Sequence, residues 1–503
     1  MAVAASIRSE QAARALVIAL LCSLPALICL RAPGTSVTDP DLGWHLSTGA
    51  WIVQHHAVPH SDPFSRLTAA PWQAYSWLFD LVLLKIYAWF NLKGIVLFTA
   101  AVLVAVAAAV FRLVSRLSCD FVRSLLLTAA VMLCMVRIYT PRPWLFTILF
   151  FVLELDILMR ARQTGSSRGL LWLPPLFILW ANIHIQFIDG LLVLAIAACE
   201  PLLRHWWKSE ARLPRARHLW LALLASIAAT LVNPYGPGLY KVAETLTSQP
   251  GVLNMVSEMQ SLPFRSFTDF LLLFMALFAS GVLFRFLKLA PFETLLLVLA
   301  AVLSFRSQRD LWIMAMIAAM IIAAGLPAGF GARKQPPLPF WAICLGGFAS
   351  AGLILVCAPL LQVANARLLA LQSKEYPAQA VDVIRQRHYT GPLFNTYNWG
   401  GYLIWKLGEP VSIDGRAGLY GDDRIRRSIA TWSGKLGWAS DSDLTSAGVV
   451  IGPSDDALMQ LLRYDPRFVL AYQDKTATVF VSRQDGKVAG DSRTTLDRGI
   501  AQP

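Results

Sequence analysis

The sequence predicts a polytopic α-helical membrane bundle of about eleven spans, followed by a small α/β domain. Hydrophobic residues make up 56% of the 503 residues and charged residues only 15%, well below the roughly 25% of soluble domains. The mean hydropathy is +0.54, and apolar runs recur up to residue 361. After Leu361 the composition becomes that of a soluble domain. These three observations define the two parts of the fold.

The candidate spans are the longest apolar runs of the chain. They fall at 15–30, 94–114, 121–138, 144–159, 169–182, 188–203, 217–233, 267–287, 291–304, 310–327 and 338–361. A further run, 74–90, contains Asp80, Lys85 and several aromatic residues, a pattern typical of a helix that lies in the membrane interface.

The distribution of basic residues predicts the orientation. If 74–90 lies on the membrane surface, all five basic clusters between the spans fall on the same side as the N-terminus. We therefore expect a multi-pass protein of a bacterial inner membrane, with a cytoplasmic N-terminus and an extracytoplasmic C-terminal domain. The net charge of +13 is explained by these orienting basic residues in the short loops. Nucleic acid is therefore not an expected partner. Six of the seven cysteines lie in apolar runs, which argues against a disulfide framework or a zinc cluster.

The predicted domain limits follow from these patterns. Residues 1–361 form the transmembrane module with its first outer loop at 31–93, residues 366–485 form the α/β domain, and residues 486–503 form a disordered tail. In the α/β domain we expect strands at 391–396, 411–414 and 448–451, a hairpin over 468–482, and intervening helices.

The first outer loop holds the strongest candidates for chemistry. Asp39 and Asp41 flank Pro40, which stiffens the segment and holds both carboxylates near one point. Such a pair suits a divalent cation (Mg²⁺ or Mn²⁺), or the charged end of a lipid-linked substrate. Helical periodicity over 42–53 places Asp41 and His45 on one face. The alternative is a helix on the membrane surface with solvated polar groups.

Further polar residues occur at the other turns on the outer face. Arg142 stands between two prolines, where it could meet a phosphate bidentately or anchor the chain among lipid headgroups. Asn182 and His184 belong to a polar segment between two apolar runs. Arg306 and Arg309 lie on the side disfavoured for basic residues, which indicates an anionic ligand or, alternatively, pairing with acids of the first loop.

In the α/β domain, Asp414 and Arg416 follow a predicted strand, where ligand sites of α/β folds usually lie. Aromatic residues around Gly400 and Gly401 suit sugar stacking or simple domain packing.

Several short motifs together resemble those of one superfamily. They are D-P-D-L-x-W-H-L-x-T-G from Asp39, D-P-F-S from Asp62, P-W-x-x-x-x-W-L from Pro71, R-P at Arg142, W-A-N-x-H from Trp180, N-P-Y-G from Asn233 and G-G-Y-L-I-W from Gly400 with D-G-R from Asp414. They recur in one uncharacterised group of bacterial membrane proteins, which resembles the GT-C superfamily of polyprenyl-phosphate-sugar-dependent glycosyltransferases, such as protein mannosyltransferases and aminoarabinose transferases.

This resemblance implies a function and assigns residues to it. It implies an inverting hexosyl or pentosyl transfer from a polyprenyl-phosphate sugar to a glycan, lipid or protein acceptor of the cell envelope. The essential first-loop acid, which binds metal or acts as the base, falls on Asp39 or Asp41, and a second acid falls on Asp80. The sequence departs from the pattern at Gly43, where a bulkier residue is usual, and at Tyr75-Ser76-Trp77, where His-Glu-Trp is expected.

Two alternatives to a transferase remain at this stage. One is a transporter of lipid-linked glycans, although no internal repeat is visible in the sequence. The other is a non-catalytic membrane scaffold of envelope assembly that binds its partner through the C-terminal domain.

Overall fold

The structure, a computed structural model, describes residues 2–67, 70–118, 120–203, 214–247, 255–327 and 338–483. The chain forms two compact units. The first, the helical unit, contains residues up to Asp39 and most of the chain from Ala74 to Leu368. The second, the mixed unit, combines residues 40–73 with residues from Leu369 onward. The predicted disordered tail lies outside the described residues, and the predicted domain limits stay predictions.

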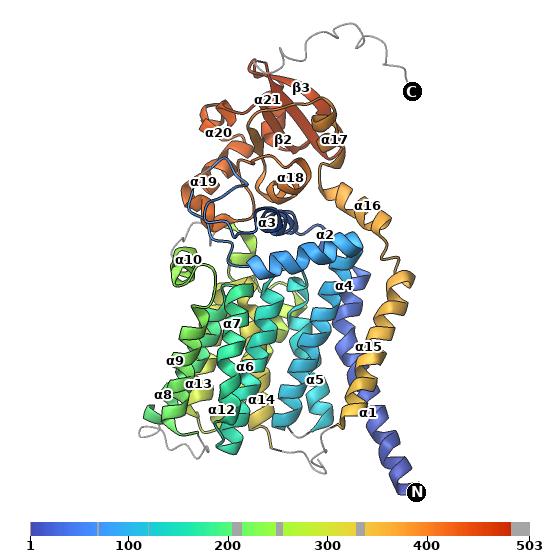
Figure 1. The fold of residues 1–503 in the computed structure, drawn as a ribbon, viewed down its shortest axis with the longest axis vertical. Coiled ribbons are helices and arrows are strands. Elements are labelled where there is room, and N and C mark those ends of the chain that lie inside the picture. The colour runs from blue at the N-terminus through green and yellow to red at the C-terminus, as the bar shows by residue number, and fades with distance from the viewer. Residues whose placement is uncertain are drawn as a thin grey trace. The chain divides into compact units, whose positions relative to one another are not determined.

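The helical unit is built from long apolar helices that run along one another (Figure 1). Its α-helices are α1 (Ala2–Arg31), α2 (Gly34–Val37), α4 (Trp77–Ser118), α5 (Phe121–Cys134), α6 (Trp144–Thr164), α7 (Leu173–Ile183), α8 (Phe187–Leu203), α9 (Ala216–Thr230), α10 (Gly238–Thr247), α12 (Phe267–Arg285), α13 (Pro291–Arg306), α14 (Leu311–Gly325) and α15 (Phe340–Leu360). Its short 3₁₀ helices are η1 (Val136–Ile138), η2 (Arg168–Trp172), η3 (Ser257–Met259) and η4 (Gln308–Asp310).

Five segments of the described residues are long and apolar enough to cross a membrane. They are Ile7–Arg31, Trp77–Ser118, Phe267–Arg285, Gln308–Gly325 and Phe340–Leu360. Shorter apolar helices pack among them, and α14 is buried on all sides from Leu311 to Ala323. A helix that is apolar all round belongs in the centre of a bundle. The chain is a multi-pass membrane protein, and the count of about eleven spans stays a prediction.

Helix α4 bends sharply at Asn91, whose left-handed φ of 53° interrupts the helical backbone. With its ψ of −148°, this residue adopts a combination that side-chain-bearing residues rarely adopt, and the helix cannot continue straight through it. Figure 1 shows the part before Asn91 lying across the end of the bundle, and the part after it running along the bundle. The expectation that 74–90 lies in the membrane interface stays a prediction.

The mixed unit contains a four-stranded sheet in the order β1-β2-β4-β3. Strands β1 (Leu393–Asn395) and β2 (Val449–Pro453) are parallel, and β4 (Ala477–Ser482) runs antiparallel to β2 and to β3 (Phe468–Gln473). The hairpin expected over 468–482 is confirmed. The strand expected at 411–414 is wrong, because this segment makes only an isolated bridge from Val411 to Ser65.

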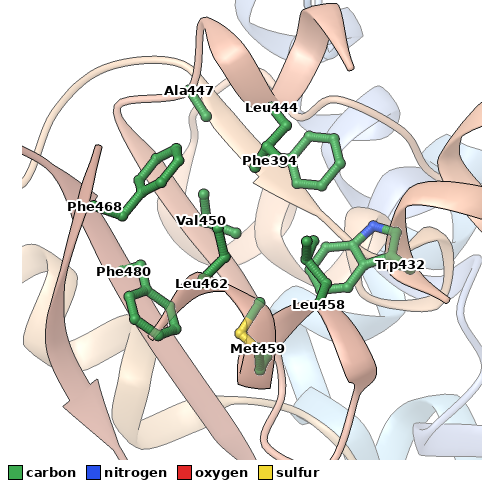
Figure 2. Close-up of a cluster of buried hydrophobic side chains, with 10 residues drawn as sticks. All are labelled: Phe394, Trp432, Leu444, Ala447, Val450, Leu458, Met459, Leu462, Phe468 and Phe480. Carbon is green, nitrogen blue, oxygen red and sulfur yellow. The ribbon is translucent and has the colours of Figure 1, made fainter. Parts of the chain in front are cut away.

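Helices make up the rest of this part of the chain. They are α3 (Leu42–His55), α17 (Ala378–Gln386), α18 (Gly400–Leu407), α19 (Ala417–Trp432), α20 (Ser442–Thr445) and α21 (Ala457–Leu462), with the 3₁₀ helices η5 (Tyr397–Trp399) and η6 (Trp438–Ser440), while α16 (Asn365–Glu375) joins the two units along the chain. Figure 2 shows apolar side chains of β1, β2, α19 and α21 meeting in one core, where Phe394 stacks on Trp432 at 5.3 Å. Burying these aromatic groups stabilises the sheet against its helices.

Helix α3, from the first outer loop, packs closely on α18 of the same unit. The approach depends on glycines, since a Cβ at Gly43 would overlap the backbone of Gly401, and a Cβ at Gly401 would overlap the carbonyl oxygen of Pro40. Only glycine lets two backbones come this near. The small residue at position 43, where a bulkier one was expected from the resemblance, therefore has a structural reason.

We predict that Gly43→Ala destabilises the mixed unit by about 1–3 kcal/mol, because the added methyl group forces α3 away from α18. The matched control is Gly34→Ala, also in a helix, where a Cβ would meet nothing within 4 Å. The measurement is the thermal unfolding midpoint in detergent, together with limited proteolysis of residues 40–73. Equal midpoints for the two variants would contradict the close contact.

Candidate functional site

The first part of the candidate site is an ion-pair cluster around Arg142, in the rigid turn before α6. Its Nε donates to both carboxylate oxygens of Asp39, at 3.0 and 2.8 Å, and its Nη1 donates to both oxygens of Glu258, at 3.0 Å each. The guanidinium carbon lies 4.7 Å from the ring centre of Trp144. Asp39 and Arg142 are both buried, and Glu258 is partly exposed. Asp39 and Arg142 were each expected from the sequence, but their contact was not, and Glu258 was not expected at all.

This cluster shows how the helical unit carries a buried acid at the end of its bundle. A buried carboxylate is costly unless a hydrogen-bonding cation meets it, and Arg142 supplies that cation from a proline-stiffened turn. One guanidinium thus binds two carboxylates that come from different parts of the helical unit. Arg142 is therefore arranged to position Asp39, and its predicted contact with a phosphate stays a prediction.

A second polar cluster surrounds η4, where α13 ends and α14 begins. The Nε2 of Gln186 donates to Asp310 at 2.8 Å and to Asp189 at 3.2 Å, linking the start of α8 to η4. Arg309 lies 3.8 Å from Asp310, a looser pair than that of Arg142, and interacts electrostatically with Glu258 as well. Arg306, at the end of α13, is exposed.

His184 lies directly after α7, in a buried hydrogen-bonded group. Its Nδ1 lies 2.8 Å from the hydroxyl of Thr147, and the indole N–H of Trp180 donates to the same hydroxyl at 2.9 Å. Burial holds the pKa of His184 well below its ordinary value, and the nearby charge of Arg309 lowers it further. We infer that this imidazole is neutral at neutral pH.

Two further predicted residues are Asn182, near the end of α7, and Asp80, in the first turn of α4. The side chain of Asn182 donates to the carbonyl oxygens of Ile178 and Val232, and it accepts a hydrogen bond of 2.9 Å from the indole of Trp77. Asp80, one turn further along α4, has no exposed surface. Asn182 thus connects α7 with the residues after α9 and with α4. Its position between two apolar runs did not predict this structural role.

In the mixed unit, Asp414 and Arg416 form a buried network with the first-loop segment. Arg416 donates from Nε and Nη2 to Asp414, at 2.9 and 2.6 Å, and from Nη1 to Asp62 at 2.6 Å. Its guanidinium carbon lies 4.7 Å from the ring centre of Trp72. Burial and then the Asp414 carboxylate raise the pKa of Tyr420 well above the usual tyrosine value, so its hydroxyl donates to Asp414 at 2.6 Å. The network joins residues 62–72 to the C-terminal part of the chain.

The other first-loop candidates also belong to the mixed unit. Asp41 precedes α3, and its carbonyl oxygen accepts the backbone N–H of His45 at 3.1 Å. The ring of His45 is buried and stacks on Trp44 at 3.7 Å. Among the described residues, no group of three or more His, Cys, Asp or Glu side chains is placed to hold a metal ion. The divalent cation expected at Asp39 and Asp41 stays a prediction.

Comparison with known proteins identifies the fold. No family model matches the chain, and no curated protein matches its sequence. The oligosaccharyltransferase of Archaeoglobus fulgidus, tethered with an acceptor peptide, aligns with a TM-score of 0.57 and 11% identity over 87% of this chain and 68% of that chain. The same protein (AglB), with an inhibitory peptide and a dolichol-phosphate, aligns with a TM-score of 0.57 and 10% identity over 87% and 69%. ArnT from Cupriavidus metallidurans, bound to undecaprenyl phosphate, gives a TM-score of 0.47 and 13% identity over 93% and 97%.

AglB and ArnT are GT-C superfamily membrane glycosyltransferases. At such low identities the similarity shows the fold alone, and the archaeal match with its TM-score of 0.57 shows it. The chain has the GT-C fold, so the resemblance inferred from its motifs is confirmed at that level. The roles given to individual residues stay predictions.

We predict that acidification destabilises the helical unit partly through His184. Below about pH 6.5 the imidazole of the unfolded protein takes up a proton that the imidazole of the folded protein does not. The stability that comes from this difference in pKa is therefore complete above about pH 6.5 and is lost as the pH falls. His184→Asn should reduce the loss between pH 6.5 and 5 by up to about 1.4 kcal/mol per pH unit. The measurement is the unfolding midpoint against pH, with His55→Asn, at an exposed position, as the control. An unchanged slope in His184→Asn would contradict the prediction.

We predict that Arg416→Met destabilises the mixed unit by roughly 3–5 kcal/mol, because the carboxylates of Asp62 and Asp414 remain buried without their cation. The control is Arg426→Met, whose side chain is 64% exposed and pairs with an exposed Asp423, so its unfolding midpoint should barely change. Both midpoints are measured at neutral pH. A loss in Arg416→Met no larger than in the control would show that the network contributes little.

Proposed function

We propose that this protein is a membrane glycosyltransferase of GT-C type. It moves a sugar from a polyprenyl-phosphate donor to an envelope acceptor at the outer face of a bacterial inner membrane, and its N-terminus lies in the cytoplasm. The observation that carries the proposal is the polar layer at one end of an apolar bundle with the GT-C fold, centred on Asp39 and Arg142. Buried charged groups at the end of a membrane bundle are expensive and usually functional.

In this proposal Asp39 or Asp41 acts as the general base. The carboxylate takes the proton of an acceptor hydroxyl while the hydroxyl oxygen bonds to the anomeric carbon of the donor sugar. The bond from that carbon to the phosphate oxygen breaks, and the polyprenyl phosphate leaves with the electron pair. One displacement without a covalent enzyme intermediate inverts the anomeric centre. Arg142 supports the role of Asp39 because its Nε contacts both carboxylate oxygens.

The leaving phosphate needs cationic donors where its negative charge develops. Arg306 is exposed and Arg309 is paired loosely with Asp310, so these two residues suit the task better than the doubly paired Arg142. His184 and Asn182 then shape the donor site from the end of α7. In the alternative version of this mechanism, Asp39 or Asp41 holds a divalent cation that assists the deprotonation indirectly.

A second candidate function is a non-catalytic scaffold with the same fold. Arg142 and Arg416 were expected to bind a ligand, but both form ion pairs with carboxylates of the protein itself. This observation favours the scaffold. In this case the C-terminal part of the chain binds an envelope component, and Asp39 has only a structural role.

The test uses purified protein in nanodiscs with a panel of radiolabelled polyprenyl-phosphate sugars. We predict that wild type consumes one donor, and that the Asp39→Asn/Asp41→Asn variant loses at least about 100-fold in rate, as expected for removal of a general base. The matched control is Asp423→Asn, a carboxylate that is 97% exposed. A parallel series with EDTA tests the predicted cation.

The outcomes separate the two candidates. Donor consumption that survives in the double variant would exclude the first-loop acids as the base. No consumption of any donor by a monodisperse wild-type protein would favour the scaffold, and binding of envelope glycans to the C-terminal part of the chain would be measured next.

A further inference from the structure

A large groove lies between α1, α4 and α15, at the other end of the helical unit from Arg142. Its volume is about 1080 Å³. Arg142 directly precedes α6, whereas the groove is lined by Arg160, near the last turn of this 21-residue helix. A helix of this length spans roughly 30 Å, about the thickness of a bilayer core. The groove and the Arg142 cluster therefore open toward opposite membrane faces.

The walls of the groove are apolar and made of small residues. Ala15 and Ala19 of α1 face Gly346 of α15, whose Cβ would lie 3.2 Å from the carbonyl oxygen of Ala15. The neighbouring Gly347 also lines the groove, but a Cβ there would meet nothing within 4 Å. All three helices are candidate membrane spans, so these walls run along the hydrocarbon layer. Such walls suit an alkyl chain and not a free inorganic anion.

The mouth of the groove is basic. Arg14, Arg112, Arg116 and Arg160 line it, together with Asp120. Arg112 and Arg116 share the single carboxylate of Asp156, and the Arg112 side chain is 64% exposed. Asp120 accepts the backbone N–H of Arg123 as the cap of α5. Four arginines and one acidic residue thus line the groove, so this part of its wall favours an anionic group.

We propose that this groove binds an anionic phospholipid. The headgroup phosphate lies against Arg112, Arg116 and Arg160, and one acyl chain follows the small-residue wall between α1 and α15. Basic pockets between transmembrane helices bind anionic lipid headgroups in this way. A phospholipid fits better than a polyprenyl phosphate, because the polar layer proposed for the polyprenyl donor lies at the opposite end of the bundle.

The test uses the full-length protein in nanodiscs with photoactivatable phosphatidylglycerol, or with phosphatidylcholine of the same chains. We expect phosphatidylglycerol to label peptides of α1 and α15 in preference to phosphatidylcholine. Arg112→Gln/Arg160→Gln should reduce this preference by roughly five-fold per arginine removed. Gly347→Phe should block labelling by filling the groove, and the control Gly352→Phe, in the same helix and also in open space, should not.

Three results would overturn the proposal. The first is equal labelling by the two lipids, and the second is labelling that persists in Gly347→Phe while this variant elutes as a monodisperse protein. The third is displacement of the probe by unlabelled polyprenyl phosphate at a lower mole fraction than by unlabelled phosphatidylglycerol. These readouts do not involve sugar transfer, so they are independent of the function proposed above.

Discussion

The helical unit depends on buried ion pairs that α6 makes with other elements near both of its ends. Arg142, at the start of α6, meets Asp39 and Glu258, and Arg162, near the end of the same helix, meets Glu200 and Glu293. An unpaired ion in an apolar interior costs several kcal/mol, whereas removing one partner of a buried pair typically costs 3–5 kcal/mol. The carboxylates come from α8, α13, η3 and the residues after α2, so α6 is fixed against different elements at its two ends. Hydrophobic burial is non-directional and does not by itself fix how the helices are placed along one another. We infer that these ion pairs specify that placement.

The same pairing decides what chemistry the acids can perform. A carboxylate held by a guanidinium on a stiff turn is oriented, as a base must be, but part of its hydrogen-bonding capacity is used by its partner. Asp39 is in this position, while Arg309 and Arg306 are bound less tightly and remain more available to an anion. Under the proposed function, the paired residues would position the acid and the less tightly paired arginines would meet the phosphate. Closed ion pairs among candidate residues are also what a purely structural protein would show, so activity is the deciding measurement.

Periodicity predicted the parts of the fold that depend on local pattern. Helix α3 and the hairpin of β3 and β4 fall where the spacing of apolar residues placed them, because these patterns are local in the sequence. The segment 411–414 has the composition of a strand, yet it pairs through a single bridge with Ser65, a partner that no local pattern indicates. Arg142 was recognisable from its prolines, but its acceptors lie 103 and 116 residues away in the sequence. Glu258 had no distinguishing neighbours, so only the folded chain could connect it to the site.

The salt bridge between Asp62 and Arg416 joins residues that are 354 positions apart. The ribosome must therefore finish nearly the whole chain, and the membrane must receive its later helices, before residues 40–73 can reach their partners. Until then α3 lacks the backbone of Gly401 against which it packs, and Asp62 lacks its cation. Closing such a distant contact is slow and leaves the segment open to proteases in the meantime. Biogenesis of this protein thus ends with an assembly step, and a chain cut short after α15 would lose the first-loop fold along with its C-terminus.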